Sequence, residues 1–167
     1  FEAGLAHPET LIDDRPTNFG GYRPRNFDFG YQGTVSVREA LEMPLNVPAI
    51  RLLEAVGPAR LVARLKRAGA EPVLPRGDRP GLPIGLGGVG LSLDQLVTLF
   101  AGLAEGGAPV ALTRLPRQAQ TAPGEFLDAR AAWQVADIIA GTSPPAGHAS
   151  GGFAYKTGTS YGYRDAW

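Results

Sequence analysis

The sequence contains no cysteine and very little histidine, which limits the chemistry that the chain can carry. Among its 167 residues there are 2 histidines, His7 and His148, and 1 methionine. Without cysteine there is no disulfide and no thiolate metal site, and so few histidines make a zinc site or a Ser-His-Asp triad hard to build. We therefore expect no metal ion and no other cofactor.

The sequence also lacks an excess of charge of either sign and a long apolar run. Its 16 basic and 16 acidic residues balance, so the basic footprint of a surface that binds nucleic acid or an anionic membrane is missing. No run of about 18 apolar residues occurs, and the first residues lack the basic and apolar regions of a signal peptide. We expect no nucleic-acid partner, and we expect any membrane anchor to lie outside this chain.

Capping signals and apolar spacing predict a mainly helical body after an irregular N-terminal segment. Residues 8–33 are rich in Pro, Gly, Asp and Asn and show no sustained period, which favours irregular structure over about 1–35. Ser36 with Glu39, and Ser92 with Gln95, match the capping box that begins helices. The predicted helices cover residues 36–43, 46–57, 58–69, 93–106 and 128–141.

Several details of these helices can be predicted as well. Asn46 is a plausible N-cap, Gly57 ends the second helix, and Ile50 and Leu53 should turn inward. Asp128 should begin the last helix and Gly141 should end it. The helix over 93–106 is apolar enough to be buried. The helix over 58–69 should leave its basic side chains in solvent, namely Arg60, Arg64, Lys66 and Arg67.

Two strands are predicted, and both come late in the chain. Alternation near Val110 and Leu112 indicates a strand over 108–115, and glycine-flanked residues 152–160 indicate another. Helices that precede strands favour an α+β fold rather than a doubly wound one. We expect one partial domain over 1–167, with a helical body over about 36–150 followed by the strand over 152–160.

Two familiar glycine motifs stand in contexts that argue against their usual meaning. Residues 85–90 ("GLGGVG") match G-x-G-x-x-G, but the prolines of "RPGLP" just before them exclude the central strand that a dinucleotide site needs. A tight turn that requires glycine is the better interpretation. Residues 158–162 match the G-x-S-x-G of α/β hydrolases, but no histidine follows Ser160 to complete a triad.

A third motif, K-T-G at residues 156–158, is more telling. Only two lysines occur, Lys66 and Lys156, and a lysine at a strand edge can simply aid solubility. Here K-T-G follows well after Asn46 in "MPLNVPA", and "RPTNFGGYRPRNFD", "GTVSVREAL" and "YKTGTSYGYRDAW" accompany it. The chain resembles, along nearly its whole length, the transpeptidase domain of class A penicillin-binding proteins, with the 1C group closest. The resemblance implies the serine β-lactamase and penicillin-binding transpeptidase fold.

This resemblance implies a D,D-transpeptidase that cross-links peptidoglycan stem peptides through a serine acyl-enzyme and binds β-lactams. Lys156 would hold the terminal carboxylate of the substrate, together with the hydroxyls of Thr157 and Thr159. Gly158 would keep the strand open for the substrate backbone. By the same resemblance, the backbone N–H of Thr159 would be an oxyanion donor, and Asn46 would bind the acyl amide and orient the catalytic lysine.

Two departures from the family pattern limit the chain. No serine has a lysine three residues later, so the S-x-x-K element is absent and the nucleophile is expected shortly before Phe1. The isolated chain should therefore be inactive. In addition, Pro44 stands where the family places the serine of S-x-N, and proline has neither a hydroxyl nor an N–H. The serines concerned are Ser36, Ser92, Ser143, Ser150 and Ser160.

The resemblance also implies features of a longer parent protein. These are a glycosyltransferase domain, a membrane anchor outside this chain, and a location on the outer, periplasmic face of the cytoplasmic membrane. Expected partners are stem peptides, β-lactams and other cell-wall synthesis proteins. Two alternatives stay open: a D,D-carboxypeptidase or β-lactamase relative that uses water as acceptor, and a module that binds stem peptides or partner proteins without turnover, which Pro44 favours.

Overall fold

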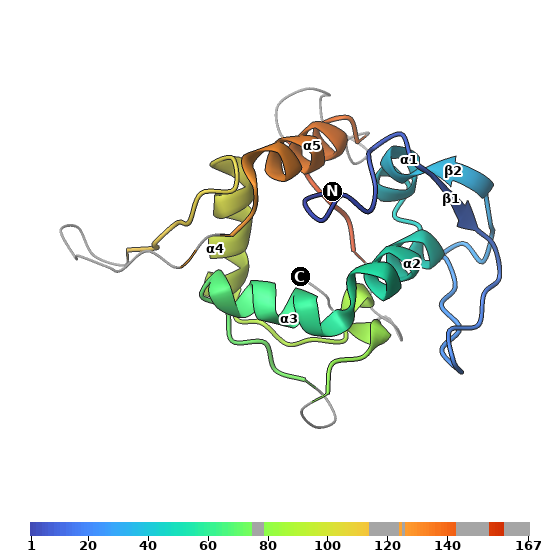
Figure 1. The fold of residues 1–167 in the computed structure, drawn as a ribbon, viewed down its shortest axis with the longest axis horizontal. Helices are drawn as coiled ribbons and strands as arrows, with labels where there is room; N and C mark the ends of the chain where they lie inside the picture. Colours follow the sequence, from blue (N-terminus) through green and yellow to red (C-terminus); the bar gives the residue numbers. More distant parts are fainter. Residues whose placement is uncertain (75–78, 114–123, 125, 143–153, 159–167) are drawn as a thin grey trace.

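The computed structural model describes residues 1–74, 79–113, 124, 126–142 and 154–158 (Figure 1). The described residues form a mixed α+β arrangement of five α-helices, one 3₁₀ helix and a two-stranded sheet. Their bounds are β1 Leu11–Asp14, β2 Gly33–Ser36, α1 Val37–Glu42, α2 Asn46–Val56, α3 Pro58–Arg67, η1 Leu82–Leu86, α4 Leu93–Ala104 and α5 Ala129–Ala140. The sheet packs against α1 and α2, whereas α4 packs against α5.

The sheet lies in the segment for which the sequence predicted irregular structure. β1 pairs antiparallel with β2, with Leu11 opposite Ser36 and Asp14 opposite Gly33. The buried residue of β1 is Asp14, while Leu11 is 71% exposed. A strand that buries a carboxylate and exposes a leucine has no apolar alternation, so the sequence pattern could not reveal it.

The two strands predicted late in the chain are not observed. Residues 108–113 contain no strand, and residues 154–158 contain none either. A strand requires a hydrogen-bonded neighbour, and no described segment pairs with either stretch. The other residues of both predictions lie outside the described part of the chain.

The predicted helix starts are confirmed where local capping determines them. The Ser36 hydroxyl accepts a hydrogen bond from the Glu39 amide, and the Glu39 carboxylate accepts one from the Ser36 amide at 2.7 Å. Hydrogen bonds from the backbone and then the hydroxyl of Ser36 lower the pKa of Glu39. The Ser92 capping box and the Asp128 N-cap are also formed, and Gly141 ends α5.

At α2 the predicted range and end are confirmed, and the predicted N-cap is wrong. Gly57, at φ +91°, ends the helix, and Ile50 and Leu53 are buried as expected. The N-cap, however, is Leu45, and Asn46 is the first helical residue. The Asn46 side chain does not cap α2, and instead its Nδ2 donates a hydrogen bond to the Arg25 carbonyl oxygen.

Two predictions about exposure are corrected. Arg64 of α3 is not left to solvent, since its guanidinium pairs with Glu2 at 2.6 Å and donates to the Phe126 carbonyl oxygen at 2.9 Å. α4 is not buried, because among the described elements it contacts only α5. Its outer face keeps three large apolar side chains exposed: Leu93, Val97 and Phe100.

The core lies beneath α2. One buried cluster consists of Phe19, Val47 and Ile50, against which Tyr22, Tyr31, Leu82 and Leu86 pack. η1 approaches α2 so closely that a Cβ on Gly85 would lie 2.8 Å from the Leu53 side chain, and Gly87 ends η1 at φ +84°. The interpretation of "GLGGVG" as a turn that requires glycine is therefore confirmed, and η1 stands where a dinucleotide site would need a strand.

A buried polar network connects β1, the β1–β2 loop and α2. Asp14 is fully buried, and its carboxylate accepts hydrogen bonds from Asn26 Nδ2 at 2.8 and 3.0 Å and from the Gln32 amide at 2.8 Å. Asn26 Nδ2 also donates to the Gly30 carbonyl oxygen, and Asn26 Oδ1 accepts the Asn46 amide at 2.8 Å. The side chain of Asn26 thus ties the loop to the first residue of α2.

Replacing Asn26 by alanine is expected to destabilise the fold. Asn26→Ala removes the bonds to the Asp14 carboxylate, the Gly30 carbonyl and the Asn46 amide. A buried polar group without a partner costs about 1–3 kcal/mol, and here more than one is left, so urea unfolding should show a loss of at least about 2 kcal/mol.

The matched control is Asn18→Ala. Asn18 is exposed and only accepts a hydrogen bond from the Gly21 amide in the same loop, so its loss should stay below about 1 kcal/mol. Equal losses in the two variants would contradict the role given to Asn26.

Candidate functional site

Asn46 lies at the N-terminal end of α2 with its carboxamide held in one orientation. Asn46 Nδ2 donates to the Arg25 carbonyl oxygen at 2.6 Å, and its backbone N–H donates to Asn26. Among the described residues no group donates to Asn46 Oδ1. The arrangement therefore leaves the amide oxygen available to a donor, such as an ammonium or a peptide N–H.

Pro44 lies in the short turn between α1 and α2, two residues before Asn46. It is exposed, and its φ is +26°. The pyrrolidine ring favours φ near about −65°, so the turn holds proline in a conformation that suits glycine or asparagine better. Proline is thus unfavourable at this position for backbone geometry.

Lys156 is half-buried, and its ammonium donates to the Thr157 carbonyl oxygen at 2.8 Å. Burial disfavours the charged form and lowers the pKa of Lys156. Thr157 and Gly158 are exposed, and a Cβ built on Gly158 would meet no atom within 4 Å. Packing therefore does not require glycine at 158, and the surface there is open. Thr159 lies outside the described residues.

The structure does not join the two halves of the predicted site. The hydrogen bonds of Asn46 go to Arg25 and Asn26, whereas that of the Lys156 ammonium goes to its own neighbour. The approach of Lys156 to Asn46 stays a prediction. As to metals, the described residues bring no three His, Asp or Glu side chains together.

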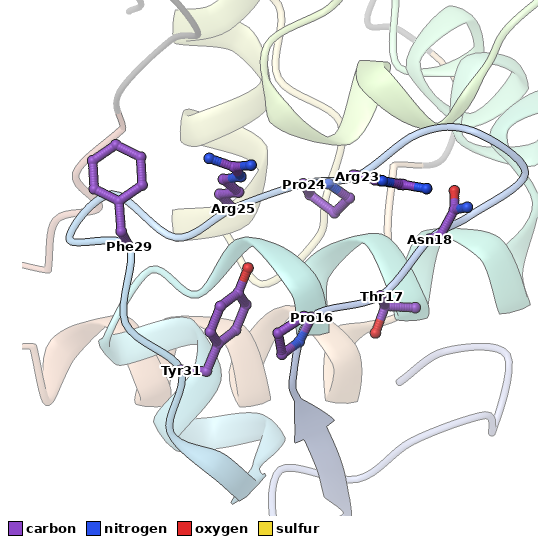
Figure 2. A pocket seen from close by; sticks show the side chains of 8 residues that line it. All are labelled: Pro16, Thr17, Asn18, Arg23, Pro24, Arg25, Phe29 and Tyr31. Atoms are coloured by element: carbon purple, nitrogen blue, oxygen red, sulfur yellow. The ribbon is translucent and has the colours of Figure 1, made fainter.

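A pocket beside Asn46 was not predicted from the sequence. It has a volume of about 480 Å³ and is formed by the β1–β2 loop, whose Arg25 carbonyl accepts the Asn46 side chain (Figure 2). We call it the loop pocket. Its lining residues are Pro16, Thr17, Asn18, Arg23, Pro24, Arg25, Phe29 and Tyr31. Basic and aromatic residues interleaved in "YRPRNFDFGY" were the available signal, although only the fold brings 16–18 beside 23–31.

The fold places the chain in a known class. It matches the structure of the penicillin-binding protein PonA1 from Mycobacterium tuberculosis with a TM-score of 0.66 and 21% identity, over 87% of this chain and 46% of that one. No family model matches the chain. At this level of identity the likeness establishes the fold alone, which matches part of that structure.

Sequence comparison makes the relation more specific. The chain is 39% identical over 171 aligned positions to penicillin-binding protein 1C of Escherichia coli, covering 100% of this chain and 22% of that protein. It is 29% identical to penicillin-binding protein 1B of Vibrio cholerae, again over 100% of this chain and over 25% of the relative. The chain is homologous to class A penicillin-binding proteins, which confirms the resemblance seen in the sequence, and it spans about a quarter or less of these relatives.

The pKa of Lys156 can be measured directly, because the chain has only one other lysine. In a Lys66→Arg variant the single remaining lysine side chain can be followed by NMR through an alkaline titration. The titration is carried out once on the folded chain and once on the chain unfolded in urea. We expect a lower pKa in the folded chain, since burial disfavours the ammonium. Between the folded and unfolded pKa values the unfolded chain then binds more protons, so stability should rise with pH in that interval. A folded pKa equal to or above the unfolded one would contradict the burial of Lys156.

Proposed function

We propose that this chain is part of a peptidoglycan D,D-transpeptidase, which cross-links stem peptides through a serine acyl-enzyme and binds β-lactams. The observation that carries the proposal is 39% identity to penicillin-binding protein 1C along the full length of the chain. The open surface at Gly158 and the half-buried ammonium of Lys156 beside it support the same assignment.

In this function Lys156 binds the terminal carboxylate of the stem peptide or the antibiotic. The ammonium already bears the cost of partial burial, and a carboxylate at hydrogen-bond distance would offset that cost and raise its pKa again. Protonation and carboxylate binding are therefore linked, so affinity falls as pH rises through the pKa of Lys156. The hydroxyls of Thr157 and Thr159 would share the carboxylate.

Asn46 contributes its amide oxygen as an acceptor. One N–H of Nδ2 is donated to the Arg25 carbonyl, and Oδ1 is left to accept from the N–H of the acyl amide or from the ammonium of the catalytic lysine. The hydrogen bond to Arg25 fixes this orientation before any ligand binds.

The nucleophilic serine and its lysine belong to the parent protein, by which we mean the longer protein proposed to contain this chain. No S-x-x-K occurs within residues 1–167, so the chain alone is inactive. The parent would also carry a glycosyltransferase domain and a membrane anchor, face the periplasmic side of the cytoplasmic membrane, and work with other cell-wall synthesis proteins. Within the part of the chain that the structure describes, no helix is both long and apolar enough to cross a bilayer.

One observation favours a second candidate, a module that binds stem peptides or partner proteins without turnover. Pro44 removes the hydroxyl that the family places two residues before Asn46, and with it a group that can relay a proton to the leaving amine. Such a module would still bind carboxylate-bearing peptides through Lys156.

The proposed function is tested by the reaction of the parent protein with a fluorescent penicillin. We expect Lys156→Ala to slow acylation about ten- to a hundredfold, because charge-assisted hydrogen bonds contribute about 1.5–3 kcal/mol. The control is Lys66→Ala on the exposed side of α3, which should leave the rate unchanged. An unchanged acylation rate for Lys156→Ala would mean that Lys156 is a solvated charge without a role in carboxylate binding. Labelling of the isolated chain of residues 1–167 would show that the nucleophile lies within it.

Variants of Pro44 in the parent protein separate the transpeptidase from the module without turnover. General acid–base assistance contributes about 10²–10⁴-fold, so Pro44→Ser should be acylated distinctly faster than the parent. Pro44→Ala relieves the backbone at φ +26° without adding a hydroxyl, and it should not match the serine variant. Equal acylation rates in all three proteins would mean that the hydroxyl is dispensable and that Pro44 is no evidence against turnover.

A further inference from the structure

The loop pocket carries positive charge that the described part of the chain does not neutralise. Arg23 and Arg25 are both exposed, and neither forms an ion pair or a hydrogen bond through its side chain with any described residue. The nearest acidic residue in sequence, Asp28, accepts a hydrogen bond from the Gly30 amide. Figure 2 shows the two guanidinium groups directed away from each other, with Pro24 between them. Two available guanidinium groups favour an anion, and the planar fork of each one suits a carboxylate.

An aromatic ring is presented at the same pocket in an unfavourable backbone conformation. Phe29 has φ +60°, which is rare for a bulky side chain, and the residue is 67% exposed. Its amide donates to the Asn26 carbonyl oxygen at 3.1 Å, so the turn presents the ring outward. Strained residues of this kind cluster at ligand sites, and Figure 2 places the Phe29 ring on the same side of Pro24 as the Arg25 guanidinium.

The walls of the loop pocket are held in place before a ligand arrives. Thr17 is bonded to the Arg51 guanidinium of α2 at 2.9 Å, and Tyr31 packs on the core cluster. Asn26, next to Arg25, belongs to the buried network of Asp14. A pre-formed site avoids the entropy of ordering a loop on binding.

We propose that the loop pocket is a binding subsite for a peptide segment that carries a carboxylate next to an apolar group. The carboxylate binds the Arg25 guanidinium, the apolar group packs against Phe29, and the Arg23 guanidinium adds positive charge on the other side of Pro24 (Figure 2). This subsite is separate from the carboxylate capture assigned to Lys156. Peptide binding at this subsite needs no acyl transfer, so the subsite goes beyond the proposed function and does not depend on it.

The direct experiment is an NMR titration of the 167-residue chain with acetyl-Ala-Glu-Ala-amide, and with acetyl-Ala-Gln-Ala-amide as the uncharged match. We expect the Glu peptide to shift the amide resonances of the non-proline residues of 16–18 and 23–31, and the Gln peptide to bind at least tenfold more weakly. Arg23→Gln combined with Arg25→Gln should weaken the Glu peptide at least tenfold. Arg60→Gln combined with Arg67→Gln, two exposed arginines on α3 with the same total change in charge, should not.

A second variant keeps the test sharp if the double arginine variant folds poorly. Phe29→Gly should raise the thermal midpoint, because glycine tolerates φ +60°, and yet weaken binding of the Glu peptide about fivefold. If Phe29 had a purely structural role, Phe29→Gly would change the thermal midpoint and the affinity for the Glu peptide in the same direction.

Each of the following results would overturn the subsite: no shifts at residues 16–18 and 23–31, equal binding of the two peptides, equal binding of inorganic phosphate, or unchanged affinity in the double arginine variant. An equal loss in the Arg60→Gln, Arg67→Gln variant would do the same, since it would indicate attraction by net charge alone. Failure of the parent protein to react with penicillin would overturn the proposed function and leave the subsite standing if the peptide still binds.

Discussion

The buried carboxylate of Asp14 is the constraint on which the rest of the described structure depends. A charged group without solvent is costly unless donors surround it, and here the donors come from Asn26 and Gln32, which both belong to the irregular β1–β2 loop. The loop must therefore follow one path. Because the other end of the Asn26 side chain accepts the Asn46 amide, that path also determines where α2 begins, although the loop has almost no regular secondary structure.

Two functional features follow from this one constraint. The loop presents Arg25 so that its carbonyl orients the Asn46 carboxamide, and the same stretch forms a wall of the loop pocket. A ligand at the pocket and a ligand at Asn46 would thus meet a common rigid support. Lys156 differs, since among the described residues its ammonium donates to the adjacent Thr157 carbonyl oxygen, and burial lowers its pKa. The two halves of the proposed transpeptidase site depend on separate parts of the chain.

The sequence predicts what is locally determined and misses what is determined by distant partners. Capping boxes at Ser36 and Ser92 locate helix starts because their bonds span three residues. The pairing of Arg64 with Glu2 joins residues far apart in sequence. In β1 the buried residue is an aspartate, so no apolar pattern marks the buried face of the strand. The candidate residues Asn46 and Lys156 came from family resemblance, whereas the loop pocket is visible only once the fold brings two loop stretches together. Apolar content predicted a buried α4, but burial depends on a covering element, and the described residues supply one only on the side of α5.

The central claim is that Asn26 holds the start of α2, and native-state hydrogen exchange at the Asn46 amide tests it most directly. Amides in the first turn of a helix have no intrahelical acceptor and normally exchange quickly. The Asn46 amide, which donates to the buried Asn26 side chain, should instead exchange with an opening free energy close to that of global unfolding. Exchange of the Asn46 amide at the rate of an unprotected first-turn amide would contradict the account.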